Sequence, residues 1–415
     1  MADATASTAT VISAGLPVPK VEHPLRNPNY RMWLIGGTIS LLGDQFYLVA
    51  LPWLVLQQTG SAATMGAILM AGAIPRALLM LFGGAVSDRI SARKIMMGTA
   101  TARTICVTVI GVLVWLRVLQ TWELYALAFS FGVADAFAAP AQAAYMPSLI
   151  KREQMVAASS VGQSTAQLTT IVGPIPAGFV MQLIGIAWAF FIDAISFLFI
   201  IGALWKLPDP PKLPGARKPV WHAIGEGIAY LWKDVPLRSL MLLATIMNFC
   251  VSGPVAIGIA YLTKTRFGSP AAYGTVIACV AVGSLLGAML AGVWKIRRRG
   301  MLILPVAAIL GVCLGCIAFT EKVWSVGSVL LVMGAAAGML NVNIAAWMMQ
   351  RIEPTIRGRV SSVLMLASYG IAPISLAAAG FLVAWNLQAM FLLAGGLMVL
   401  TAAGAALQKQ VRAIE

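Results

Sequence analysis

Long apolar runs alternate with short polar segments along almost the whole chain. Each run has about 20–27 residues, about the length that a helix needs to cross a ~30 Å hydrocarbon core. The pattern predicts an all-α polytopic membrane protein with twelve transmembrane helices. The predicted spans lie at about 30–57, 61–86, 95–117, 121–146, 158–184, 187–205, 238–262, 270–294, 300–320, 323–349, 360–384 and 387–407.

A polar segment divides the spans into two groups of six. It contains the Pro-rich sequence "KLPDPPKLPGARKP" and then "VWHAIGEGIAYLWKDV", which has the pattern of an amphipathic helix on a membrane surface. The predicted organisation is a disordered cytoplasmic tail (1–29), a six-helix bundle (30–205), a cytoplasmic linker (206–237), a second six-helix bundle (238–407) and a short cytoplasmic tail (408–415).

The two groups of spans share weak internal similarity. The second span aligns with the eighth from Gly66 and Gly274 onward, which places Arg89 opposite Arg297. The tripeptide "SSV" opens both the fifth and the eleventh span, at 159–161 and 361–363. Two six-helix repeats joined by a long loop are typical of a transporter whose substrate path lies between the halves.

Composition and charge support the membrane assignment and give the orientation. Hydrophobic residues make up 60% of the chain, and its mean hydropathy is +0.87, which excludes a soluble globular domain. Of the 29 Lys and Arg residues, 23 lie on the side of the two termini, which predicts that both termini face the cytoplasm. The net charge of +15 is spread over separate short loops, so it does not indicate a nucleic-acid partner.

Residues that could serve catalysis or metal binding are few. All five cysteines lie in predicted spans, and the two histidines lie in the tail and the linker. We therefore expect neither a cofactor nor a metal site, and the chain does not resemble an enzyme.

Charge gathers unusually in "GGAVSDRISARK" (83–94), which follows a long apolar run. This stretch resembles the signature that the major facilitator superfamily carries in the loop between its second and third spans, with Ser91 at the usual glycine. The stretches "GDQFYLVALPWLV", "IPRALLMLFGGAVSDR", "DAFAAPAQAAYMPSLI", "FFIDAISF" and "RGRVSSV" are similar to the drug:proton antiporter branch that contains macrolide-efflux and enterobactin-exporter proteins. The resemblance spans about 30–407 and implies the major facilitator fold.

The charged loop has two interpretations. Arg89, Arg93 and Lys94 are explained by orientation alone, whereas an acid such as Asp88 contributes little to orientation. In the family, the matching Asp meets the start of span 11 while the cytoplasmic side is closed, which implies a conformational latch made by Asp88 and its basic neighbours. The alternative is that Asp88 is a solvated loop acid.

Five charged residues lie within predicted spans of the N-terminal half. Each would cost roughly 2.5–3.5 kcal/mol at a helix centre facing lipid, so we expect them to face the interior or to pair. A rise of ~1.5 Å per residue puts Asp44 and Arg76 at depths that an Arg side chain can bridge, and likewise Asp135 and Arg103. The expected pairs are therefore Asp44–Arg76 and Asp135–Arg103, either as static ion pairs or as pairs that change during transport. The fifth residue is Asp193.

Spans 1 and 4 line the central cavity in this superfamily, so the resemblance implies that Asp44 and Asp135 carry protons. We expect Asp193 on span 6 to be structural. The C-terminal spans offer only neutral polar groups for the cavity: Asn248, Asn341, Asn343 and Tyr369.

Span 5 contains "GPIPAG", which resembles the Gly-Pro signature of antiporters in this superfamily. Prolines remove backbone hydrogen bonds and glycines allow helices to approach closely, so the stretch suits a bending gate. Its residues are Gly173, Pro174, Pro176 and Gly178.

These observations favour a monomeric, proton-coupled exporter of amphiphilic or hydrophobic small molecules, such as antibiotics or siderophores, that works by alternating access. The alternative is a lipid or lysolipid transporter, or an uncoupled facilitator, of the same fold.

Overall fold

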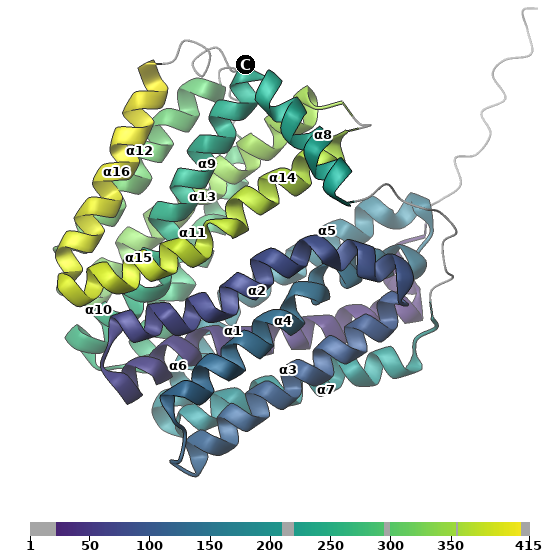
Figure 1. Ribbon diagram of the computed structural model, residues 1–415, viewed down its shortest axis with the longest axis horizontal. Coiled ribbons are helices and arrows are strands. Elements are labelled where there is room, and N and C mark those ends of the chain that lie inside the picture. The colour runs from purple at the N-terminus through teal and green to yellow at the C-terminus, as the bar shows by residue number, and fades with distance from the viewer. Residues whose placement is uncertain (1–21, 210–219, 294–298, 354–355, 408–415) are drawn as a thin grey trace, which may run out of the picture.

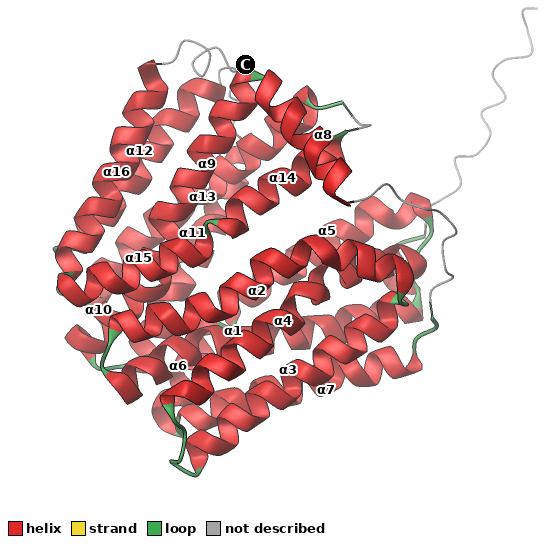
Figure 2. Ribbon diagram, in the orientation of Figure 1, coloured by secondary structure: helices red, strands yellow, loops and turns green. Residues whose placement is uncertain are grey.

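The computed structural model describes residues 22–209, 220–293, 299–353 and 356–407. Within these ranges the structure is helical, with no strand (Figure 2). The N-terminal half contains α1 (Pro28–Thr59), α2 (Ala62–Arg89), α3 (Ala92–Trp115), α4 (Thr121–Tyr145), α5 (Met155–Val172), α6 (Pro174–Leu183) and α7 (Ile186–Lys206).

The C-terminal half follows the amphipathic helix α8 (Val220–Lys233). It contains α9 (Val235–Gly253), the π-helical turn η4 (Pro254–Gly258), α10 (Ile259–Phe267), α11 (Pro270–Val293), α12 (Arg299–Ile317), α13 (Val323–Arg351), α14 (Arg357–Gly370), α15 (Ala372–Trp385) and α16 (Leu387–Leu407).

Ten segments of the described chain are long and apolar enough to cross a membrane. The other two predicted spans are also helical. One is the pair α5–α6, which is interrupted at Gly173, and the other is α12, whose apolar part runs from Ile303 to Ile317. The prediction of a multi-pass, all-helical fold is confirmed.

Helices α1–α7 form one half of the molecule and α9–α16 the other (Figure 1). The halves approach each other near α6 and α10, and they diverge toward α5 and α8. We call the end at which α1 begins and α2 ends the basic end, because most Lys and Arg residues lie there, and the other end the opposite end.

Glycines make the closest contacts between the halves. A Cβ added at Gly66 on α2 would lie 2.8 Å from the carbonyl oxygen of Leu376 and 3.0 Å from the Cα of Gly380 on α15. On the other side of the molecule, a Cβ at Gly178 on α6 would lie 2.5 Å from the carbonyl oxygen of Pro270, and one at Gly274 on α11 would collide with that of Pro174.

These contacts follow the internal repeat. Gly66 and Gly274 are equivalent in the alignment of spans 2 and 8, and Gly178 and Gly380 are equivalent when the two "SSV" segments are aligned. The two contacts between the halves, α2 with α15 and α6 with α11, are therefore equivalent under the internal repeat. Backbone-to-backbone approach of this kind requires the absence of a side chain.

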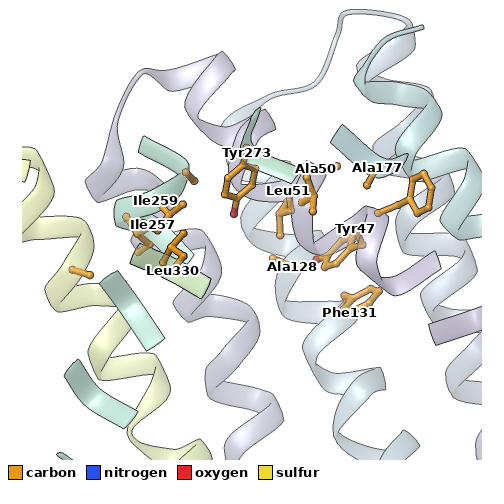
Figure 3. Packing of buried hydrophobic residues seen from close by; sticks show 14 of the residues in the cluster. Tyr47, Ala50, Leu51, Ala128, Phe131, Ala177, Ile257, Ile259, Tyr273 and Leu330 are labelled. Atoms are coloured by element: carbon orange, nitrogen blue, oxygen red, sulfur yellow. The ribbon is translucent and has the colours of Figure 1, made fainter. Parts of the chain in front are cut away.

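Buried side chains continue across the region where the halves meet. Figure 3 shows them running from Ile257 and Ile259 in the C-terminal half, past Tyr273, to Tyr47 and Phe131 in the N-terminal half. The rings of Tyr47 and Phe131 stack with centroids 4.2 Å apart.

Two features differ in detail from the sequence prediction. Residues 22–27, predicted to belong to the disordered tail, include a short helical turn (Pro24–Arg26), and α1 already begins at Pro28; Asn27 donates its side-chain amide to the carbonyl of Leu149 at 2.6 Å. Span 11 is not continuous, because α14 ends at Gly370 and α15 begins at Ala372. The tails at 1–21 and 408–415 and the linker at 210–219 lie outside the described residues.

Span 7 is also interrupted, and a side chain from span 11 fills the interruption. The hydroxyl of Ser375 on α15 donates to the carbonyl of Phe249 at 2.5 Å and accepts from the backbone N–H of Gly253 at 2.8 Å. These two backbone groups are the ones that would bond directly in a regular helix. Ser375 is therefore inserted into the ladder of α9, immediately before Pro254 and the π-helical turn.

Candidate functional site: a charge network inside the N-terminal half

Arg103 on α3 lies at the centre of the intramembrane charges. Its guanidinium contacts the carboxylate of Asp44 on α1, and its Nη1 lies 3.6 Å from Oδ1 of Asp135 on α4. The rings of Phe131 and Phe197 cover it, with centroids 5.0 Å and 4.4 Å from Cζ. The side chain is only 10% exposed, so Arg103 is a buried cation that bridges two carboxylates.

Arg76 on α2 pairs with Asp135. Its Nε lies 3.1 Å from Oδ2 of Asp135. The same guanidinium lies over the ring of Tyr369 on α14, with Cζ 5.5 Å from the ring centroid. The Arg76 side chain is 48% exposed, in contrast to Arg103.

The predicted Asp44–Arg76 pair is therefore wrong, whereas the predicted contact between Asp135 and Arg103 is present. Asp44 pairs with Arg103 rather than with Arg76, and Asp135 contacts both arginines. The reason is the side-by-side packing of the helices. Helix α2 packs closely along α4, where Gly132 fits against the backbone of Gly72. This packing brings Arg76 to Asp135. Depth along the helix axis alone could not distinguish the two arrangements.

Asp193 on α7 is fully buried beside this network. The hydroxyl of Ser196 donates to its backbone oxygen at 2.7 Å and lies 3.4 Å from Oδ1, while Oδ2 has no hydrogen-bond partner among the described residues. A close approach of α1 to α7 places it there, because a Cβ on Gly43 would lie 2.8 Å from Oδ1 of Asp193. Asp193 is therefore a neighbour of Asp44 with no basic partner of its own in the described part of the chain.

The five charges do not balance if all are ionised. Three carboxyl groups (Asp44, Asp135 and Asp193) share two guanidinium groups (Arg76 and Arg103). Burial disfavours an uncompensated charge, and a carboxyl group can escape that penalty by binding a proton. The arrangement is thus able to hold a proton.

Access to water differs among the three carboxyl groups. The side chains of Asp44 and Asp135 are 21% and 20% exposed, whereas Asp193 is 0% exposed. Of the three, only the first two have exposed side-chain atoms. This difference decides which groups can exchange a proton directly with water.

The neutral candidates in the C-terminal half differ in their surroundings. Asn343 is buried and donates to the carbonyl of Met339 on its own helix, and Asn248 donates to the carbonyl of Ala244 in the same way. Asn341 is exposed. Of the four, Tyr369 is the one that contacts the charge network.

The residues predicted to form the latch fall into two sets. The side chains of Asp88 and Arg89 lie outside the described residues, so their expected contact stays a prediction. Arg93 donates to the carbonyls of Leu204 and Trp205 at 2.6 and 3.0 Å. It therefore holds the end of α7 within the N-terminal half rather than facing span 11.

Arg93 has a further partner in the same half, since its Nη1 lies 3.4 Å from the carboxylate of Asp209. The remaining member of the predicted latch, Lys94, is exposed.

The predicted gate in span 5 coincides with the break between α5 and α6. Gly173 lies at the break and packs on α1, where an added Cβ would lie 2.5 Å from the Cβ of Gln45. Pro174 and Pro176 open α6 and lack backbone N–H groups, and Gly178 makes the contact with α11 described above. The stretch thus combines a helix interruption with a close backbone contact between the halves.

One group that the sequence did not reveal lies beside this gate. The side-chain oxygen of Gln182 on α6 accepts from the hydroxyl of Ser269 at 2.8 Å and from the backbone N–H of Ala271 at 3.3 Å. Ser269 in turn accepts from the N–H of Ala272. Gln182 therefore provides a hydrogen-bond acceptor, from the other half of the molecule, for a backbone N–H at the start of α11. This contact lies at the opposite end.

Comparison with known proteins agrees with this architecture. The family model described as Major Facilitator Superfamily matches residues 33–374 and, in a second match, 241–410. The chain is 28% identical over 381 residues to the multidrug efflux pump Tap of Mycolicibacterium fortuitum, covering 86% of this chain and 90% of that protein. It is 24% identical over 341 residues to macrolide efflux protein A of Streptococcus pyogenes, covering 80% and 84%.

Solved structures show the same fold at low sequence identity. A mutant form of the nucleoside transporter NupG superposes with a TM-score of 0.78 at 13% identity, covering 91% of this chain and 99% of that one. A bacterial homologue of the human lysosomal transporter Spinster, in an inward-facing and unoccupied conformation, gives 0.70 at 14% identity, covering 93% and 98%. The chain belongs to the major facilitator superfamily.

Proposed function

We propose that this protein is a proton-coupled efflux transporter of amphiphilic small molecules in the bacterial inner membrane. The observation that carries the proposal is the surplus carboxyl group in the network, where three carboxyl groups (Asp44, Asp135 and Asp193) lie among two guanidinium groups (Arg76 and Arg103). A protein that only needed to hold its helices together would gain nothing from an unbalanced buried charge. A protein that carries a proton needs such a group.

The proton is carried by Asp44 and Asp135. Both are partly exposed, and both depend on Arg103 for compensation. When one carboxylate is protonated, Arg103 compensates the other. Movement of Arg76 away from Asp135, or back to it, then loads or releases a proton. Asp193, fully buried, supports the packing of α1 on α7.

Alternating access of the two ends gives the transport its direction. The basic end faces the cytoplasm by the distribution of Lys and Arg, so the halves diverge on the cytoplasmic side in this conformation. The glycine contacts and Gln182 close the other side. The break at Gly173 lets α5 move while α6 remains packed on α11.

The substrate class rests on the relatives and on the lining of the site. Similar proteins are called a multidrug efflux pump and a macrolide efflux protein. In this chain the half-exposed guanidinium of Arg76 lies over the exposed ring of Tyr369. Such a surface accommodates molecules with both an apolar body and a polar group. The transporter works as a monomer, with membrane lipid around it.

The direct test uses inside-out vesicles that contain the purified protein and erythromycin as the probe. We expect accumulation of the macrolide when a pH gradient is imposed, and its loss when the gradient is collapsed with nigericin. Vesicles containing the Asp44→Asn, Asp135→Asn double variant are the control. Transport that ignores the gradient would show an uncoupled facilitator, and transport of lysolipid but not of the macrolide would show a different substrate class.

A further inference from the structure

The charge network lies within the N-terminal half, yet a contact between the guanidinium of Arg76 and the ring of Tyr369 on α14 connects it to the other half. We propose that Tyr369 is a positioning residue that couples the movement of the C-terminal half to the protonation of the N-terminal charge network. This role rests on the proposed function and adds the element that links its two parts.

The geometry at Arg76 allows two interactions at once. A guanidinium can place its face on an aromatic ring while its edge donates hydrogen bonds, so the two interactions are compatible. Here Cζ lies 5.5 Å from the ring centroid of Tyr369, and Nε lies 3.1 Å from Oδ2 of Asp135. The ring therefore helps to hold the guanidinium in the position from which it contacts the carboxylate.

Arg76 needs such a support. Its side chain is 48% exposed, and Tyr369 is 43% exposed, so both face the space between the halves. An arginine in such a position has many accessible rotamers and competing water. Arg103, in contrast, is fixed by Phe131 and Phe197 and by two carboxylates. Arg76 is the arginine whose position can change.

Tyr369 occupies a place in its helix from which it can move. It lies next to the break in span 11, where α14 ends at Gly370 and α15 begins at Ala372. Helix α15 is packed tightly on α2 through Gly380. Rotation of α14 about this break would move the Tyr369 ring relative to Arg76 while α15 stays in contact with α2.

The groups that respond to such a movement surround Asp135. The charged and titratable ones come from every neighbouring helix: Arg76 (α2), Arg103 (α3), Asp44 and Tyr47 (α1) and, beyond them, Asp193 (α7). Of these, Arg76 is the one that also contacts the ring of Tyr369. When the ring leaves, Arg76 is held less firmly at Asp135, and the network binds a proton more readily.

The test follows the conformation as a function of pH and needs no substrate. Spin labels are placed at two exposed positions after replacement of the native cysteines: Val156 on α5, in the N-terminal half, and Ile228 on α8, the helix that lies beside α14 of the C-terminal half at the basic end (Figure 1). Distance distributions are measured by double electron–electron resonance from pH 5 to 9. For the unmodified network we expect a pH-dependent change with a single midpoint.

We expect Tyr369→Leu to raise that midpoint by roughly half a pH unit, because it removes a cation–π contact of modest size. Tyr369→Phe keeps the ring face, so its midpoint should match that of the parent protein. Phe381→Leu, which removes an exposed aromatic side chain from the other segment of span 11, is the matched control and should leave the midpoint unchanged.

The outcomes separate the role of Tyr369 from the proposed function. If the parent protein shows a pH-dependent change and Tyr369→Leu has the same midpoint, Tyr369 does not position Arg76, and its proposed role is wrong while the proposed function stands. If the parent protein shows no dependence on pH, both are wrong. An equal shift in Tyr369→Phe would assign the effect to the hydroxyl and would also overturn the role given to the ring.

Discussion

Arg76 on α2 pairs with Asp135 on α4, with its Nε 3.1 Å from the carboxylate oxygen. This pair leaves Arg103 as the arginine that contacts Asp44, and it makes Asp135 the residue that both arginines share. The two arginines are consequently not equivalent. Arg103 is buried and fixed, whereas Arg76 is half-exposed and contacts the other half of the molecule.

The difference in burial predicts different losses of stability. Arg103→Gln strands Asp44 and should lower the free energy of unfolding by about 3–5 kcal/mol, the usual effect of breaking a buried pair. Arg76→Gln should lower it much less, because water screens a half-exposed side chain. Tm measurements in detergent give the comparison, with Arg31→Gln, an exposed arginine on α1, as the control. A larger loss in Arg76→Gln than in Arg103→Gln would contradict the assignment of partners.

A double-mutant cycle tests the pair itself. If Arg76 contacts Asp135, the losses from Arg76→Gln and Asp135→Asn should not add, and the cycle of Arg76→Gln with Asp44→Asn should be closer to additive. The opposite pattern would restore the Asp44–Arg76 pair that the sequence alone predicts.

The contact of α1 with α7 depends on one glycine. Gly43→Ala should lower Tm strongly, because the new Cβ would collide with Ser196 and press on Asp193. Gly37→Ala lies on the same helix with nothing within 4 Å of its Cβ position. That control should leave Tm unchanged or raise it, since alanine is the better helix former. Similar effects of the two substitutions would mean that α1 and α7 are not packed as described.

Gln182 should favour closure of the opposite end. Gln182→Ala removes the acceptor for Ser269 and for the N–H of Ala271, which are on the other half, so the open state of that end should become more populated. Gln58→Ala is the matched control, because Gln58 donates to Leu119 within its own half at the same end. Labels at Leu183 and Trp324, both exposed there, report the distance. Equal distance distributions in the two variants would show that Gln182 does not hold this end closed.

Two residues of the charged loop, Asp88 and Arg93, should have different effects when substituted. Asp88→Asn should shift the balance toward the conformation open at the basic end without lowering Tm, if Asp88 latches the halves. Arg93→Gln should lower Tm without shifting the balance, because Arg93 binds the end of α7 in its own half. Labels at Val156 and Ile228 and melting curves on the same samples distinguish the two effects. A shift by Arg93→Gln alone would reverse these roles.

Hydropathy and the internal repeat predicted most of the fold. The membrane requires the apolar spans, and the repeat relates the two halves. Each span must be apolar for about 20 residues, and duplication leaves the same glycines at equivalent contacts. The positions of the five intramembrane charges also predicted that they would gather inside the bundle, since lipid excludes them. These predictions use only the position of a residue along one helix axis.

The partners could not be predicted from such positions. Two acids and two arginines at similar depths permit both pairings, and the packing of α2 on α4 decides between them. The role of Gln182 depends on a helix of the other half, so a lone glutamine at the end of a span gave no signal. The hydrogen bonds of Asn248 and Asn343 to their own helices likewise could not be read from their positions in the sequence.

Proton release on substrate binding would show whether Asp44 and Asp135 carry the transported proton. Erythromycin is added to the purified protein in weakly buffered detergent solution, and released protons are measured together with the binding affinity. We expect the parent protein to release protons, and Asp193→Asn, which removes a fully buried group, to do the same. Asp44→Asn and Asp135→Asn should bind the macrolide with little change in affinity and release far fewer protons. Full release by both of these variants would contradict the assignment of the two residues as proton carriers.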